Sequence, residues 1–306
     1  MANFLVILLC LSLGMILKAS GRLGAEGSRV VNGLVINLSL PAMVLTQLRH
    51  LEFTSELLVA VSAPWLLFAL NCGIIVALGK FLRWRPEVTG ALALTTGLAN
   101  TSFVGFPLLE ALIGPEALRV GVVVDQLGSF LILSTAALIV LGVFSRKNIN
   151  NTPLWKRVLF FPPLAAVLMA VALNVVPSPS PAIADAIYAS LERLAVTLIP
   201  LALISVGLQL TWNTNAWRDT ARYVALGLVL KLVIAPALLA LFYFKVLGLQ
   251  NQMMHIALLE VAMAPMITGA ILAIEGGLDR HVASAMVFVG IPVSLVTVPL
   301  WNWLLK

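Results

Sequence analysis

Long apolar stretches alternate with short polar connections along the whole chain. A helix needs about 20 apolar residues to cross the hydrocarbon core of a bilayer. On that basis the pattern predicts an all-α polytopic membrane protein with ten spans and no inserted soluble domain. The predicted spans are residues 2–18, 30–48, 57–82, 88–112, 117–144, 158–176, 185–210, 221–246, 252–277 and 281–305.

The fourth and ninth spans are each interrupted near their centres, at Asn100–Pro107 and at Met263–Met266. Lipid offers no hydrogen-bond partner, so the backbone groups that a break frees must face protein, water or a ligand. Two breaks at corresponding places in two halves of a membrane protein indicate a transporter's binding site. The candidate substrate-binding residues are Asn100, Thr101, Ser102, Gly105, Pro107, Met263, Ala264, Pro265 and Met266.

The composition agrees with a membrane protein and excludes a soluble one. Of the 306 residues, 61% are hydrophobic and 10% are charged, against about 25% charged in soluble domains. Cys10 and Cys72 both fall inside apolar segments, which argues against a disulfide framework or a metal site. The N-terminal apolar run lacks the positive region of a signal peptide and is expected to stay as the first span.

The net charge of +6 reflects basic loops rather than nucleic-acid binding, because cytoplasmic loops carry an excess of Lys and Arg. With the N-terminus outside, thirteen basic residues fall on the inner side and four on the outer side. We therefore expect a multi-pass protein of the cytoplasmic (inner) membrane with both termini outside. The inner residues are Lys18, Arg22, Arg29, Lys80, Arg83, Arg85, Arg146, Lys147, Lys156, Arg157, Arg218, Arg222 and Arg280; the outer ones are Arg49, Arg119, Lys245 and Lys306.

The predicted spans divide into two sets of five, residues 1–144 and 158–306, joined by a basic cytoplasmic linker at 145–157. Consecutive halves with an odd number of spans insert with opposite topology, so related halves would form an inverted repeat. Pro41 in the second span corresponds to Pro200 in the seventh, and the two breaks correspond to each other. The order of these matches favours two related halves.

Several stretches resemble the auxin efflux carrier family, which includes plant carriers and bacterial malonate-type transporters. The resemblance covers nearly the whole chain. The stretches that carry it are Gly97–Leu109, Pro200–Leu208, Asn37–Pro41 and Val124–Gln126. Unlike the plant carriers, the chain has no long cytoplasmic loop, and it has Met263-Ala264-Pro265 where they place an asparagine beside the proline. These departures suggest a compact prokaryotic member and argue against carrying over auxin as the substrate.

The resemblance implies ten helices in two inverted five-helix repeats whose broken fourth and ninth helices cross, as in bile-acid symporters and sodium–proton antiporters of the NhaA type. It further implies a scaffold of about 2–48 and 158–210, through which a homodimer would form. A transport domain of about 57–144 and 221–305 would move against this scaffold. The cargo implied is a small organic anion such as a mono- or dicarboxylate.

The chemistry of the breaks also suits an anion. Asn100 lies about 12 residues, or roughly 18 Å, into its span, so both breaks fall near the bilayer midplane. Each break begins a half-helix whose first N–H groups are unpaired and carry partial positive charge. Two such ends in one cavity form an anion site without a buried Arg or Lys. The alternative is a proline kink in which Asn100 hydrogen-bonds a freed carbonyl.

Ionisable residues inside spans are functional candidates because burying them is costly. Asp125, with Gln126 beside it, either takes up a proton or ligates a cation during transport, or lies in a water-filled vestibule with no role in coupling. Lys231 and Glu260 are expected to form a structural pair; otherwise Lys231 adds positive charge near the cargo. The coupling ion is H⁺ or Na⁺, and no cofactor is expected.

Ser205 and Gln209 lie one turn apart in the seventh span and share a helix face. Together with Asn37 and Ser39 they are candidates for lining the path on the scaffold side. Polar bonding between helices is the alternative role for Ser205 and Gln209.

The motifs leave three classes of function. The leading one is a secondary carrier that works by elevator-type alternating access, since no Gly-x-x-x-x-Gly-Lys-Ser/Thr sequence for nucleotide binding occurs. An anion channel and a non-transporting receptor or sensor are the alternatives. An enzyme is not expected, because the chain has neither a His-Glu-x-x-His motif nor a spaced pair of intramembrane aspartates.

Overall fold

A computed structural model describes residues 2–23, 26–49, 54–145, 162–175, 181–210 and 217–306. Within these residues the protein is helical throughout, and the sole β-type pairing is an isolated bridge between Ala99 and Pro265. Except for Ser145, the predicted basic linker at 145–157 lies outside the described residues.

Six helical stretches of the described chain are long and apolar enough to cross a membrane, which makes this an all-α polytopic membrane protein. Shorter apolar helices occur at Phe4–Ala19, Thr101–Leu112 and Pro162–Asn174. The six long stretches are Gly27–Gln47, Ser55–Phe81, Ala117–Phe144, Ala182–Gln209, Thr220–Val246 and Arg280–Leu304.

Local sequence explains where several helices begin. The Thr54 side chain accepts a hydrogen bond from the Leu57 N–H at 3.2 Å and caps the helix that follows. Asn251 caps a later helix in the same way, accepting from Met254 N–H at 2.8 Å. Pro86 occupies the first turn of its helix, where a missing N–H costs nothing.

The predicted seventh span corresponds to the apolar helical stretch Ala182–Gln209, which a turn divides into α12 (Pro181–Ala195) and α13 (Leu198–Gln209). Pro200 explains the interruption, because its ring has no N–H to donate and clashes with the carbonyl four residues earlier. The turn between the two helices is held by the Thr197 hydroxyl, which donates to the Leu194 carbonyl at 2.6 Å.

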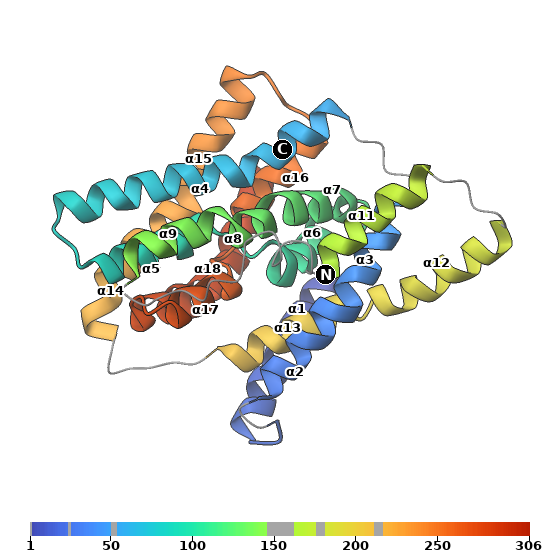
Figure 1. Cartoon of the computed structure of the whole chain (residues 1–306), viewed down its shortest axis with the longest axis horizontal. Coiled ribbons are helices and arrows are strands. Elements are labelled where there is room, and N and C mark those ends of the chain that lie inside the picture. Colours follow the sequence, from blue (N-terminus) through green and yellow to red (C-terminus); the bar gives the residue numbers. More distant parts are fainter. Residues whose placement is uncertain (1, 24–25, 50–53, 146–161, 176–180, 211–216) are drawn as a thin grey trace.

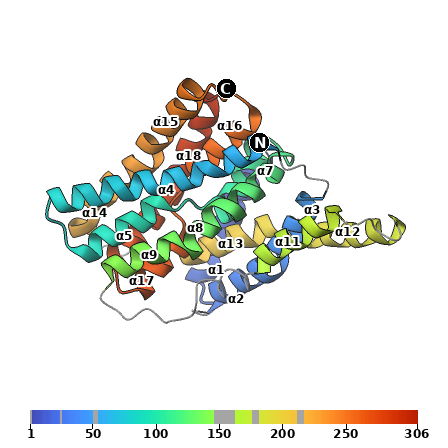
Figure 2. The same cartoon turned by 45° about the horizontal axis from the view of Figure 1, so that its top comes forward.

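The helices pack in two groups (Figure 1). In the first group, α13 packs along α1 and α2, while α3 packs on α11 and α12; α12 forms one edge of the molecule in both views (Figures 1 and 2). Besides α12 and α13, the first group comprises α1 (Ala2–Ala19), α2 (Gly27–Leu34), η1 (Val35–Ser39), α3 (Leu40–Gln47) and α11 (Pro162–Val175).

The second group is built around α4, α5 and α18, and it contains both interrupted helices. Its contacts join α4 to α5 and α16, and α18 to α5, α14 and α17. Its members are α4 (Ser55–Phe81), α5 (Pro86–Gly97), η2 (Thr101–Gly105), α6 (Phe106–Leu112), α7 (Ala117–Val124), η3 (Asp125–Phe130), α8 (Leu131–Ser134), α9 (Ala136–Phe144), α14 (Trp217–Val229), η5 (Leu230–Ile234), α15 (Ala235–Ala240), η6 (Leu241–Val246), α16 (Gln252–Val261), α17 (Ile267–Glu275) and α18 (Arg280–Leu304).

Candidate functional site

The first interruption separates α5 from the π-helical turn η2. Leu98 is extended, and Asn100 caps the new helix by accepting a hydrogen bond from Phe103 N–H at 3.2 Å. The side-chain nitrogen of Asn100 is buried and has no hydrogen-bond partner among the described residues. The Asn100 side chain therefore does not donate to a freed carbonyl, as the proline-kink alternative requires.

The second interruption lies between α16 and α17. Met266 precedes α17 in an extended conformation, and no side chain caps that helix. Among the described side chains, nothing accepts from the first N–H groups of α17. This end of the helix keeps the partial positive charge that a carboxylate prefers.

The two interruptions lie side by side and satisfy each other's backbone. Asn100 N–H donates to the Ala264 carbonyl at 2.9 Å, and Met266 N–H donates to the Leu98 carbonyl at 3.1 Å. These bonds frame the antiparallel bridge between Ala99 and Pro265. Two breaks about 165 residues apart in sequence thus form one crossing, in which two of the freed N–H groups and two of the freed carbonyls are paired.

Asp125, the first residue of η3, lies against the N-terminal turn of η2 and is 2% exposed. Its carboxylate accepts hydrogen bonds from the Thr101 hydroxyl, from the Ser102 hydroxyl at 2.6 Å and from the Gln126 amide at 2.6 Å. All three partners donate, which suits an ionised carboxylate. A carboxyl group of the protein itself therefore occupies this helix end.

A cavity of about 90 Å³ lies beside the crossing, between the two helix groups. The volume suits a small solute, because drug-sized ligands need roughly 300 Å³ or more. Its polar lining is made by Asn100, Ser102, Asp125, Gln126 and Thr268 of the second group and by Asn32 and Gln209 of the first.

Two of the lining side chains present buried polar atoms without a partner in the described residues, Nδ2 of Asn100 and Oε1 of Gln126. Met266 and Ile267 bring the uncapped end of α17 to the same cavity. The cavity therefore offers an amide donor and a positive helix end opposite the negative Asp125.

Other predicted residues support the crossing without lining this cavity. Pro265, Ala264 and Met263 are part of the crossing's backbone, and Thr101 acts on the cavity through Asp125. Pro107 lines a different cavity.

The predicted path-lining residues fall into two sets. Gln209 lines the cavity, and its amide donates to Ser205 at 3.1 Å. Ser205 in turn donates to the Asn32 side chain at 2.5 Å. Asn37 is exposed and bonded to its own helix, and Ser39 is buried against Thr197, so neither lines this cavity.

Sequence reasoning missed Asn32 and Thr268. Asn32 lies inside the predicted second span, where a polar side chain was a usable signal. Thr268 follows the second break by two residues and gave no signal of its own. Both reach the cavity because the crossing brings α17 opposite α2.

Lys231 and Glu260 are both fully buried, but they do not form the expected pair. The Lys231 ammonium donates to the Val261 carbonyl at 3.0 Å, at the end of α16. Both carboxyl oxygens of Glu260 lack a partner in the described residues. The lysine is held at the backbone carbonyl next to Glu260 rather than at its carboxyl group.

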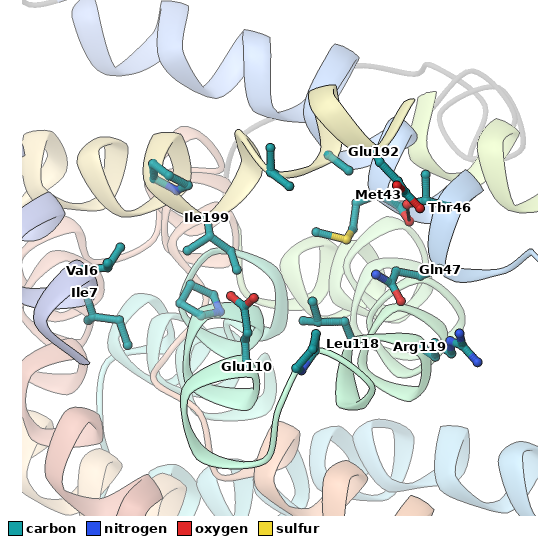
Figure 3. Close-up of a pocket in the computed structure, with 15 residues that line it drawn as sticks. Val6, Ile7, Met43, Thr46, Gln47, Glu110, Leu118, Arg119, Glu192 and Ile199 are labelled. Carbon is teal, nitrogen blue, oxygen red and sulfur yellow. Dashed lines mark hydrogen bonds between the residues drawn. The ribbon is translucent and has the colours of Figure 1, made fainter. Parts of the chain in front are cut away.

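A larger cavity, about 450 Å³, lies between α1, α3, α12 and α13 on one side and α6 and α7 on the other. Figure 3 shows Glu110 of α6 pointing into it, below Ile199 of α13. Glu192 and Arg119 complete its charged lining. It shares no lining residue with the cavity at the crossing.

Comparison with known proteins decides the family. The sequence pattern described as "Membrane transport protein" matches residues 1–302. The chain belongs to this family, which includes the auxin efflux carriers. It is accordingly a membrane transporter and not an enzyme.

Two uncharacterized transporters match nearly the whole chain, and a plant carrier matches part of it. An uncharacterized transporter of Methanothermobacter thermautotrophicus is 30% identical over 300 residues, covering 97% of this chain and 96% of that protein. The uncharacterized transporter YfdV of Escherichia coli is 24% identical, covering 98% and 95%. The probable auxin efflux carrier component 5a of rice is 35% identical over 95 residues, 31% of this chain and 26% of its own length.

Proposed function

We propose that this transporter is a secondary carrier of small organic carboxylates that works by alternating access. The observation that carries the proposal is the crossing of two broken helices beside a small cavity at the junction of two helix groups. The group containing α4–α9 and α14–α18 would move as a transport domain. The group containing α1–α3 and α11–α13 would be the scaffold. In this proposal ten spans form two inverted repeats, and both termini lie outside the cytoplasmic membrane.

The cavity chemistry supports a carboxylate. The uncapped end of α17 and the free amide of Asn100 donate, and a carboxylate accepts. Asp125 in the same lining repels an anion, since like charges a few ångströms apart cost several kcal/mol at low dielectric. Cargo entry therefore favours the uptake of a cation with it, which points to coupling with H⁺ or Na⁺.

A carrier fits the two cavities better than a channel does. The cavity at the crossing and the cavity of Figure 3 have separate linings, which favours a carrier over a single continuous pore. An uncoupled carrier would still export a monoanion, because an inside-negative potential contributes about 2.3 kcal/mol per charge per 100 mV.

Asn100→Ala tests the proposed site. In proteoliposomes screened with labelled mono- and dicarboxylates, we expect wild-type uptake to saturate and to support counterflow. Loss of one hydrogen bond to a charged ligand costs about 1.5–3 kcal/mol, so the variant should raise KM by roughly 10- to 100-fold.

Asn174→Ala is the matched control, because it removes an amide that donates to the Leu48 carbonyl on α3, outside both cavities. Its uptake should equal that of the wild type. Wild-type kinetics from Asn100→Ala would contradict the site, and unsaturable flux without counterflow would indicate a channel.

A further inference from the structure

Glu260 lies at the end of α16, one residue before the last residue of that helix and two before the second break. Its side chain is 0% exposed, and neither carboxyl oxygen has a hydrogen-bond partner among the described residues. Buried polar side chains in folded proteins nearly always have a partner. An unpartnered carboxyl beside a transport site therefore calls for a functional explanation.

Two glycines make the space for this side chain. A Cβ atom at Gly105 would lie 2.5 Å from one Glu260 oxygen, and a Cβ atom at Gly121 would lie 3.0 Å from the other. The position of Gly121 is also walled by Leu109 and Phe106. The other oxygen near these walls is the Asn100 carbonyl, 3.3 Å from the Gly105 Cβ position, and it already accepts from the Gly105 N–H. These surroundings suit a neutral carboxyl group, because an unpaired buried charge is very costly.

Few charged groups lie on the helices that pack around α16. Asp125 of η3 interacts electrostatically with Glu260, and Lys231 of η5 is bound to the Val261 carbonyl. The remaining ionisable groups on α4, α7 and α18 are the Cys72 thiol within α4 and five groups in the first or last turn of their helices: Glu56, Lys80, Arg119, Arg280 and His281. Asp125 is therefore the charged group that acts most directly on the protonation of Glu260.

We propose that Glu260 binds the exchangeable proton that travels with the cargo. The inference rests on the proposed function and identifies its coupling ion and site. Asp125 accepts hydrogen bonds from three donors that can stabilise a charge, whereas Glu260 has no such donor. An anion entering beside Asp125 adds negative charge, which favours Glu260 in its protonated form. The structure then represents the proton-loaded state, and the carboxyl group releases H⁺ to water after the transport domain has moved.

The proton site is tested first without cargo. Infrared spectra of the purified protein should contain a protonated-carboxyl band that Glu260→Gln lacks and Asp125→Asn retains. The band should disappear at a lower pH in Asp125→Asn than in wild type, because the neighbouring negative charge is gone. An unchanged band in Glu260→Gln, or an unchanged transition in Asp125→Asn, overturns the proposal.

Coupling is tested in proteoliposomes with labelled malonate and the other carboxylates of the screen, at zero membrane potential. A gradient of one pH unit should drive about tenfold accumulation of a singly coupled anion by the wild type. Glu260→Gln should show no accumulation, while exchanging labelled anion in proportion to its folded amount. Pyranine trapped inside should report proton entry with the wild type and none with Glu260→Gln.

Two variants keep the result interpretable. Glu260→Asp preserves the carboxyl group and should recover part of the accumulation, which a variant that merely misfolds would not. Glu56→Gln removes an exposed carboxyl in the first turn of α4 and should accumulate anion as the wild type does. Accumulation by Glu260→Gln, or accumulation driven by sodium alone, overturns the proposal. If the wild type moves no carboxylate, the proposed function fails, and the infrared result decides the proton site separately.

Discussion

Asp125 shows how single residues organise the crossing. Its carboxyl group accepts hydrogen bonds from the hydroxyls of Thr101 and Ser102, which would otherwise lack a partner at the start of η2. One of the two helix ends is therefore neutralised internally. The end of α17 has no such partner, and the cargo is expected there.

The contact between Thr101 and Asp125 yields a stability prediction. Thr101→Val leaves a buried carboxylate short of one donor, so the free energy of unfolding should fall by about 1–3 kcal/mol. Thr95→Val is the control: Thr95 is equally buried but donates to the carbonyl of Ala91 on its own helix. The free energy of unfolding of Thr95→Val should fall by less than about 1 kcal/mol, since the Ala91 carbonyl keeps other partners. Chemical unfolding in detergent micelles measures both, and equal losses would contradict the role of Thr101.

At the scale of elements, the closest helix contact joins α1 to α13. A Cβ atom at Gly207 would lie 2.3 Å from the Leu11 carbonyl oxygen, and one at Gly14 would lie 2.2 Å from the Ile204 carbonyl oxygen. Small residues at helix interfaces allow backbones to approach in this way. The contact joins helices from the two sequence halves and fixes the first helix group.

Gly207→Ala should therefore separate α1 from α13. The atoms that obstruct a Cβ at Gly207 belong to the backbone of Leu11 and Gly14, so a rotamer change cannot relieve the strain. We expect the free energy of unfolding to fall by about 1–3 kcal/mol. Gly33→Ala has free space around its Cβ and should be neutral or stabilising, by up to about 1 kcal/mol from helix propensity. Thermal unfolding in detergent compares them. Similar melting temperatures for the two variants would show that α1 and α13 are not closely packed.

For the whole molecule, the open question is its direction in the membrane. The excess of basic residues at one side predicts that both termini lie outside. Alkaline phosphatase fused after Lys306 should be active, and a green fluorescent protein fused there and exported unfolded should be dark. The same fluorescent protein inserted after Ser145 should be bright. The opposite pattern would reverse the orientation.

Much of the architecture follows from local chemistry. The sequence predicts the apolar segments and the positions of the breaks at Asn100 and Pro265. It can do so because the length of an apolar segment and the effect of a proline or polar residue on a helix are local properties. Intramembrane Asp125 was found in the same way. Membership in the transporter family also follows from sequence alone, since the match extends over residues 1–302.

The tertiary structure alone decided which groups meet. Three contacts between distant segments illustrate this. Asn100 donates to the Ala264 carbonyl, Asn32 lines the cavity, and Lys231 donates to the Val261 carbonyl instead of pairing with Glu260. Such contacts depend on how helices cross and on the room that glycines such as Gly105 leave. The sequence by itself determined that the chain spans a membrane and where its helices break. Only packing decided that one broken end holds Asp125 and the other stays open, because hydrogen-bond partners are assigned by geometry in space.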